Sequence, residues 1–480
     1  MDDRIKTEFT KIANALGWSV SFSNGNPGVH AVARDGIKHR FGYLSSYSES
    51  EYRAIANSVE LVFVSSMSYR ADRIAKNAAV YPSSDFLYVM TDWNMKAIGI
   101  ELPVFENKPT THETIRIIEE NPLQQIYTHL RSLTSTTVVN QAVRRHAEKE
   151  CIILDSNVIN AKAEGVTYLV QNAIDYYDSA SVGNMTQRLL NLYYGTIALM
   201  EAEMLISGDQ YKNLSEIEAI TSSGHGMTTF GDAKSLREFY VGVMDRGLFQ
   251  AWLSHRGIDV SGFAPSRQKA EKSEYVISLD DLFRHIPELQ DIMQETEEDY
   301  KPYFLFPYYD SVFNHTTGLN GRVYEPEYPG SYISFLNREG KTDLEWEKEL
   351  IEGFLTPFTI TGVYQERKST GWRTYICHPD GTHLYECYHT HKGMNASMVI
   401  SPLFGRTDDW EVFAVMILYA LSIIVRYLPN LWTRIMHGDL DYCKALLYQF
   451  SRVAERELTQ IFLEKLTGKK VMLLHPQSMI

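Results

Sequence analysis

The chain has 480 residues, of which 44% are hydrophobic and 22% are charged, as in soluble globular proteins built from two or three domains. A net charge of −14 argues against nucleic-acid binding over the whole surface, because such binding requires cationic side chains to neutralise phosphates, although a local basic patch stays open. Four cysteines exclude a disulfide scaffold, and the first residues lack the apolar stretch of a signal peptide, so we expect a cytoplasmic protein.

Residues 1–103 are predicted to form a small α/β domain. Apolar residues at helical spacing alternate there with short β-prone runs, and Asp35-Gly36 is typical of a tight hairpin turn. The predicted helices cover 4–16, 49–57 and 69–79, and the predicted strands cover 18–22, 29–33, 38–44, 61–64 and 86–90. Residues 104–120 are predicted to be a linker, because the stretch from Pro103 to Pro109 closes the α/β domain.

The order of these strands resembles the core of Mrr-type restriction-endonuclease-like domains. The resemblance rests on Leu16-Gly-Trp-x-Val20, Gly28-x-His-Ala-Val-Ala33, Arg40-Phe-Gly-Tyr-Leu44 and Leu61-Val-Phe-Val64. That family implies an acidic residue on one strand and Glu/Gln-x-Lys on the next, which hold Mg²⁺. Here the first position falls near His30 and the second strand carries Arg40, while Asp35 is a turn residue. We therefore expect a degenerate site, and an unrelated α/β domain stays open.

A large, mainly helical domain is predicted over residues 121–467, with a β-containing insertion at about 300–395 and a C-terminal tail at 468–480. Two blocks, 188–205 and 418–432, are too apolar to stand alone in water and are expected to pack against each other. The longest apolar run, 412–425, would span about 21 Å as a helix. Because a bilayer core needs roughly 30 Å, we predict a buried helix and no membrane partner. The overall fold class is α+β, predominantly helical.

The helical domain resembles the YaaC-like family over about residues 121–467. The residues that carry the resemblance are Gln125–Leu133, Leu189–Gly195, Gly224–Met227, Gly247–Phe249, Ile400–Pro402 and Leu421–Trp432. The resemblance implies a fold and no mechanism, since the family has no established activity.

Five residues of these motifs are candidates for a ligand-binding site: Tyr193, Tyr194, His225, Arg426 and Trp432. His225 lies between two glycines, so it is a candidate acid–base or anion-binding residue, or it simply terminates a helix. Arg426 lies in an apolar helix, where a guanidinium requires carboxylate, phosphate or carbonyl partners. We favour an internal salt bridge to Glu201 or Glu203, with anion binding as the alternative. His225 and Arg426 are also the only catalytic candidates.

A cluster of thiols and imidazoles surrounds a predicted hairpin formed by 372–378 and 383–388. Thiolates with imidazoles suit Zn²⁺, but adjacent strand residues face opposite sides. We expect an ordinary hairpin and no cofactor, with Zn²⁺ here or Mg²⁺ elsewhere kept open. The candidate ligands are Cys377, His378, His383 and Cys387, with His389 and His391 close by.

Taken together, the sequence favours a non-catalytic recognition or assembly component of a prokaryotic multi-protein system, with anti-phage defence as its setting by analogy. The expected partners are other protein subunits or copies of the same chain, and nucleic acid through a partner or a local patch. The alternatives are a nuclease, either metal-dependent or of the HEPN type, and a ligand-sensing helical oligomer. The HEPN motif requires an arginine and a histidine with four to six residues between them on one helix, and no predicted helix carries it.

Overall fold

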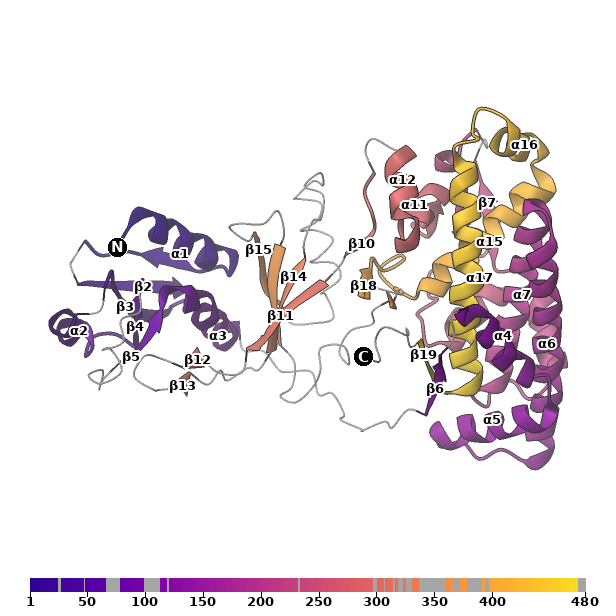
Figure 1. Ribbon diagram of the computed structural model, residues 1–480, viewed down its shortest axis with the longest axis horizontal. Coiled ribbons are helices and arrows are strands. Elements are labelled where there is room, and N and C mark those ends of the chain that lie inside the picture. Colours follow the sequence, from indigo (N-terminus) through magenta and orange to yellow (C-terminus); the bar gives the residue numbers. More distant parts are fainter. Residues whose placement is uncertain are drawn as a thin grey trace. The chain divides into compact units, whose positions relative to one another are not determined.

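A computed structural model describes residues 1–24, 27–46, 48–65, 78–98, 113–118, 121–231, 234–296, 300–305 and 397–473, and shorter strand segments between 307 and 392. The chain divides into two compact units (Figure 1). The first, called the N-terminal unit, comprises residues 1–108 and 305–390. The second, called the helical body, comprises residues 109–304 and 391–480.

The N-terminal unit contains a five-stranded mixed sheet in the order β1-β2-β3-β4-β5. The first three strands form an antiparallel meander, and β3, β4 and β5 run parallel. Asp35 and Gly36, both with positive φ, make the predicted turn between β2 and β3. The strands are β1 (Ser19–Ser21), β2 (Gly28–Arg34), β3 (Ile37–Leu44), β4 (Leu61–Val64) and β5 (Ala79–Pro82).

Three helices accompany this sheet: α1 (Asp3–Ala15), α2 (Glu49–Ile55) and α3 (Phe86–Ile98). An aromatic core joins α1, the sheet and α3, in which the rings of Phe9 and Phe86 stack with centroids 3.6 Å apart. The prediction of a strand over 86–90 is wrong, since these residues begin α3. The helix predicted over 69–79 lies largely outside the described residues.

The backbone of residues 307–377 adds strands to the N-terminal unit. Strands β11 (Pro307–Phe313), β14 (Gly330–Phe335), β16 (Trp372–Cys377) and β15 (Ile360–Gln365) form an antiparallel sheet in that order. A separate pair is formed by β12 (Thr316–Thr317) and β13 (Val323–Tyr324). The strand predicted over 372–378 is therefore present, whereas 383–388 lies outside the described residues.

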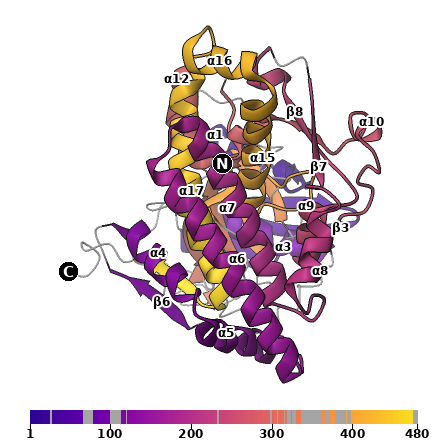
Figure 2. The ribbon, with the colours of Figure 1, turned by 90° about the vertical axis from the view of Figure 1, so that its right-hand side faces the viewer.

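Long helices dominate the helical body, and Figure 2 shows α6 and α7 lying along α15 and α17. The longer helices are α4 (Pro122–Ser132), α5 (Thr136–Lys149), α6 (Ser156–Val182), α7 (Met185–Ile206), α15 (Trp410–Tyr427), α16 (Pro429–His437) and α17 (Cys443–Thr467). The shorter ones are α8 (Leu214–Thr221), α9 (Leu248–His255), α10 (Arg267–Ala270), α11 (Leu279–Arg284) and α12 (Gln290–Thr296).

The two apolar blocks pack against each other as predicted, because α7 contacts both α15 and α17. Helix α15 is long and apolar enough to cross a membrane, but 78% of it is buried inside the protein. Its side chains face neighbouring helices, as in the core helix of a soluble protein.

Three small sheets complete the helical body. Strands β7 (Met227–Phe230), β8 (Tyr240–Val243) and β9 (Val276–Ser278) are antiparallel. In a second sheet, β18 (Ser397–Ile400) lies between β10 (Phe304–Leu305) and β17 (His391–Lys392). In the third, β6 (Thr114–Ile117) pairs in parallel with β19 (Lys470–Leu473). The stretches predicted as linker and tail thus each supply a strand.

Candidate ligand-binding site

Four of the five candidate residues meet where α7, α15 and one loop come together. Helix α7 supplies Tyr193 and Tyr194, helix α15 supplies Arg426, and the loop between α8 and β7 supplies His225. The Tyr193 ring lies 5.4 Å from that of Tyr194 and 5.9 Å from that of His225, centroid to centroid. We call these four residues, with Tyr419 and Ser422 of α15, the Tyr–His–Arg cluster.

Backbone geometry explains the glycines around His225. The carbonyl groups of Gly224 and His225 accept hydrogen bonds from the N–H groups of Leu248 and Phe249, at 2.9 and 3.0 Å, and so satisfy the first turn of α9. Gly224, Gly226 and Gly247 all have positive φ, which glycine adopts without strain. The backbone of this loop therefore caps the start of helix α9, and the imidazole of His225 contacts Tyr193.

Arg426 is held by neutral oxygen atoms. Its Nε donates to the Ser422 carbonyl at 3.1 Å, one terminal nitrogen donates to the Ser422 hydroxyl at 3.1 Å, and the other donates to the Tyr194 hydroxyl at 3.0 Å. Among the described residues no carboxylate lies within 4.0 Å of this guanidinium. A half-buried cation therefore has hydrogen-bond partners but no counter-charge in the part of the chain that the structure describes.

The expected salt bridge from Arg426 to Glu201 or Glu203 is therefore wrong. Glu201 accepts a hydrogen bond from the Thr221 hydroxyl at 2.6 Å. Glu203 accepts from Arg256 at 3.0 Å and from the Trp252 indole at 2.8 Å. Arg256 is buried and also contacts Glu411 and Asp409, so it, and not Arg426, balances the acidic residues of this core.

The protonation states of Tyr193 and His225 follow from their surroundings. Burial raises the pKa of Tyr193, so its hydroxyl stays protonated, and its oxygen lies within hydrogen-bond distance of Nδ1 of His225, at 3.1 Å. Burial, and then the charge of Arg426, lower the pKa of His225, so the ring is neutral at pH 7. When Nδ1 accepts from the Tyr193 hydroxyl, the ring hydrogen is on Nε2, which can then donate to a ligand.

The cluster thus presents hydrogen-bond donors: the Arg426 guanidinium, the His225 Nε2–H, and the Tyr194 hydroxyl, which accepts from Arg426 and can still donate. Exposed aromatic rings lie beside it. Tyr176 is 39% exposed with its ring 5.6 Å from that of Tyr194, and Tyr427 is 64% exposed and lies 5.1 Å from the guanidinium carbon. Such donors suit an anion, and the rings suit a planar group attached to it.

Trp432 lies in a different environment. Its indole donates to the Thr186 hydroxyl at 3.0 Å, and it lines a cavity of about 450 Å³ with Asn184, Arg188 and His437. Arg188 is occupied there by an ion pair with Glu455. Trp432 is therefore not part of the site that the other four candidates form.

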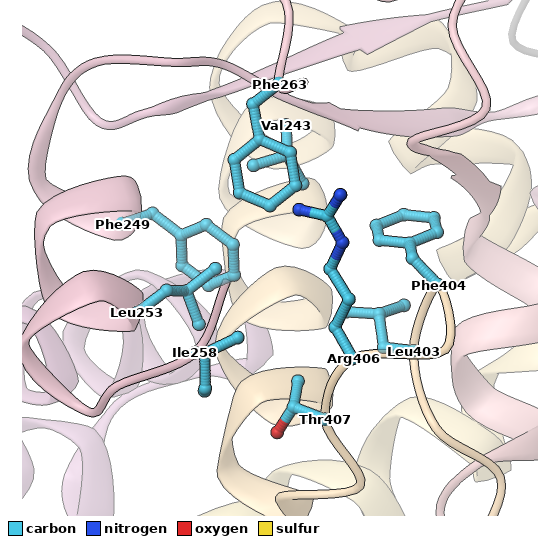
Figure 3. A pocket seen from close by; sticks show the side chains of 9 residues that line it. All are labelled: Val243, Phe249, Leu253, Ile258, Phe263, Leu403, Phe404, Arg406 and Thr407. Atoms are coloured by element: carbon cyan, nitrogen blue, oxygen red, sulfur yellow. The ribbon is translucent and has the colours of Figure 1, made fainter. Parts of the chain in front are cut away.

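An apolar pocket lies beyond α9, whose first turn the His225 loop caps. Figure 3 shows Phe249, Phe263, Phe404 and the stem of Arg406 around it. Its volume is about 10 Å³, which is close to the space of one water molecule. It is a packing defect and holds no ligand-sized space.

The structure does not describe the side chains of the four predicted metal ligands. His378, His383, Cys387 and His389 lie outside the described residues, and only the backbone of Cys377 is described. His391 belongs to the helical body, where its Nε2 lies 2.6 Å from a carboxylate oxygen of Glu288.

In the N-terminal unit, the positions compared with a nuclease carry other groups. His30 is buried, accepts a hydrogen bond from the Ser23 N–H at 3.1 Å, and has a pKa lowered to about 4 by burial. Asp35 occupies its turn, and Glu60 contacts His39 and the Arg40 N–H. Over residues 1–24, 27–46, 48–65 and 78–98, no three possible metal ligands converge.

Sequence reasoning missed Tyr419 and Ser422. The Tyr419 hydroxyl donates to the Met227 carbonyl at 2.8 Å, and Ser422 binds Arg426. A signal was present: Tyr419, Ser422 and Arg426 are three and then four residues apart, so they form one polar stripe on an apolar helix.

These features define a class of protein: a mainly helical body with a polar, donor-rich cluster between its core helices, joined to a small α/β unit. The family model for YaaC-like proteins matches residues 131–466, which is more than half of the chain. The chain belongs to the YaaC-like family. No curated protein and no solved structure matched it.

Proposed function

We propose that this protein is a non-catalytic recognition component of a prokaryotic multi-protein system, and that its helical body binds an anionic group of its ligand at the Tyr–His–Arg cluster. One observation carries the proposal: the Arg426 guanidinium is oriented by two hydroxyls and a carbonyl and has no carboxylate partner among the described residues. A phosphate or carboxylate would supply the missing charge and accept from the remaining donors.

The neutral state of His225 supports binding over general-acid catalysis. Its Nδ1 is occupied by Tyr193, and its lowered pKa removes the proton that an acid would deliver at pH 7. The N-terminal unit would then serve recognition or assembly. The sheet order and α2 between β3 and β4 support an endonuclease-like outline, in which His30 and Arg40 would occupy the positions of metal ligands.

The setting we propose is cytoplasmic and is anti-phage defence, with other subunits or further copies of the chain as partners. This step rests on analogy with the pairing of a nuclease-like module and a large scaffold. A helicase, ATPase or methyltransferase encoded beside this chain, and its co-purification with the protein, would support it.

The binding test compares wild type with Arg426→Ala in calorimetric titrations with inorganic phosphate and with ATP. A charge-assisted hydrogen bond contributes about 1.5–3 kcal/mol, so we expect affinity to fall by roughly ten- to a hundredfold. Arg434→Ala is the matched control, because Arg434 of the neighbouring helix α16 is paired with Asp439 in the turn that follows that helix. Equal affinity in wild type and Arg426→Ala would refute the anion site.

A cleavage assay tests the non-catalytic part. Full-length protein is incubated with DNA and RNA in Mg²⁺ or Mn²⁺, and we expect no turnover. Cleavage that His225→Ala abolishes, with the helical circular dichroism unchanged, would favour the competing nuclease function.

A further inference from the structure

Glu288, His391 and Glu457 bring two carboxylates and an imidazole together in the helical body, away from the Tyr–His–Arg cluster residues. They come from three separate elements: the 3-10 turn Pro287–Leu289, strand β17 and helix α17. One ligand atom from each lies within 4.8 Å of the other two. Their side chains are only 13%, 7% and 7% exposed.

We propose that these three residues form a binding site for a divalent transition-metal ion, for which Zn²⁺ is the representative. An imidazole nitrogen and two carboxylate oxygens form an N/O ligand set that suits such an ion, which they would bind at about 2.0–2.2 Å. Among the described residues three protein ligands are provided, which would leave a fourth position for water or a substrate oxygen.

The surroundings hold the ligands in place. The Trp410 indole donates to the second carboxylate oxygen of Glu288 at 3.3 Å, and its ring stacks on that of His391 with an interplanar angle of 13°. Arg456 donates to Glu457 at 2.7 Å. Contacts of this kind orient metal ligands and limit their freedom in known sites.

A proton on His391 is the competitor of the metal ion. Burial alone would lower the pKa of His391, but the hydrogen bond and charge of Glu288, with the charges of Glu457 and Glu411, raise it. Glu457 in turn has a pKa raised by burial, against the charge of Arg456.

The test measures Zn²⁺ bound to purified full-length protein by equilibrium dialysis and metal analysis, and repeats the measurement with Mn²⁺. Other cysteines and histidines of the chain can also bind Zn²⁺, so the proposed site is tested by comparing variants with wild type. His391→Gln and Glu457→Gln should each lose about one equivalent of bound Zn²⁺ relative to wild type. Glu455→Gln is the matched control: Glu455 is also buried on α17, but it is paired with Arg188 and Tyr127.

Thermal melting provides the second readout. Zn²⁺ should raise the melting temperature of wild type and of Glu455→Gln, and should not raise that of Glu457→Gln. Glu457→Gln keeps the size of the side chain, so it remains informative if His391→Gln does not fold. Identical Zn²⁺ binding in Glu457→Gln and Glu455→Gln would overturn the proposal.

Discussion

At the scale of single residues, His285 shows how burial alone can set a charge state. Its ring stacks between those of Tyr303 and Phe413, at 4.7 and 4.5 Å, and its Nδ1 donates to the Asp281 carbonyl at 2.7 Å. Burial lowers the pKa of His285 to about 4. The folded protein therefore keeps this ring neutral at pH values where the unfolded chain protonates it.

The stability of the helical body should consequently depend on this residue at acid pH. The unfolded ring binds a proton below pH 6.5 and the folded ring only near pH 4, so stability present above pH 6.5 is lost as pH falls. For a shift of this size the loss at pH 4 is about 3 kcal/mol. The measurement is the free energy of unfolding, followed by helical circular dichroism, at pH 7 and pH 4.5.

His285→Gln supplies the comparison, since glutamine does not titrate. The variant is expected to be less stable than wild type at pH 7 but to lose less stability on acidification. Parallel pH profiles for the two proteins would contradict the prediction.

Most of the candidate site could be predicted residue by residue, for a simple reason. A tyrosine or arginine within an apolar helix must find a polar partner, so Tyr193, Tyr194 and Arg426 are informative on their own. Which partner each finds depends on the fold: Glu203 is an equally good candidate in the sequence, but it pairs with Arg256. His391 lies beside the predicted Zn²⁺ ligands in the sequence, but nothing there indicates its grouping with Glu288 and Glu457, because the three residues lie far apart in the chain.

At the scale of elements, the loop that carries His225 depends on Gly247. A Cβ atom there would lie 2.4 Å from the Gly226 nitrogen and 2.7 Å from the Gly224 oxygen, and φ is +103°. We expect Gly247→Ala to destabilise the protein by about 1–3 kcal/mol and to weaken anion binding, because the loop must move. Chemical denaturation and the phosphate titration measure the two effects.

Gly257→Ala is the control for that substitution. Gly257 also has positive φ, +76°, but nothing lies within 4 Å of the position that a Cβ atom would take there. Gly257→Ala should lower the free energy of unfolding through backbone strain alone, because it does not displace the loop. If both variants bind phosphate equally, the close approach of Gly247 to the loop does not matter for the site.

Secondary structure was predictable where periodicity was long. Helices α6, α7 and α15 carry many turns of consistent spacing, and the hairpin of β2 and β3 has a turn sequence of its own. The run 86–90 misleads because a short apolar segment suits a buried strand and a buried helix equally. In the structure the 3-10 turn Ser83–Asp85 leads directly into α3, so the run belongs to a helix.

At the scale of the whole molecule, the helical body is interrupted in sequence by residues 305–390, which group with the N-terminal unit. No local pattern could predict this division, because it depends on contacts between distant segments. The interruption begins and ends in one sheet: β10 and β17 flank β18. Their backbones are therefore about 10 Å apart.

The helical body should fold without the interrupting segment. In a variant of residues 109–473, residues 306–390 are replaced by a linker of about six glycine and serine residues, which can span up to roughly 20 Å. We expect helical circular dichroism and one cooperative melting transition. A broad, non-cooperative transition would mean that the body needs the N-terminal unit.

The parallel pairing of β6 with β19 has a consequence for synthesis. Residues 114–117 leave the ribosome early, and their partner strand, 470–473, follows only after some 350 further residues have been translated. Helices α15 and α17, which cover α7, also arrive late. The face of α7 that α15 and α17 cover therefore lacks these partners until translation is nearly over, which makes chaperone protection during that interval valuable to the cell.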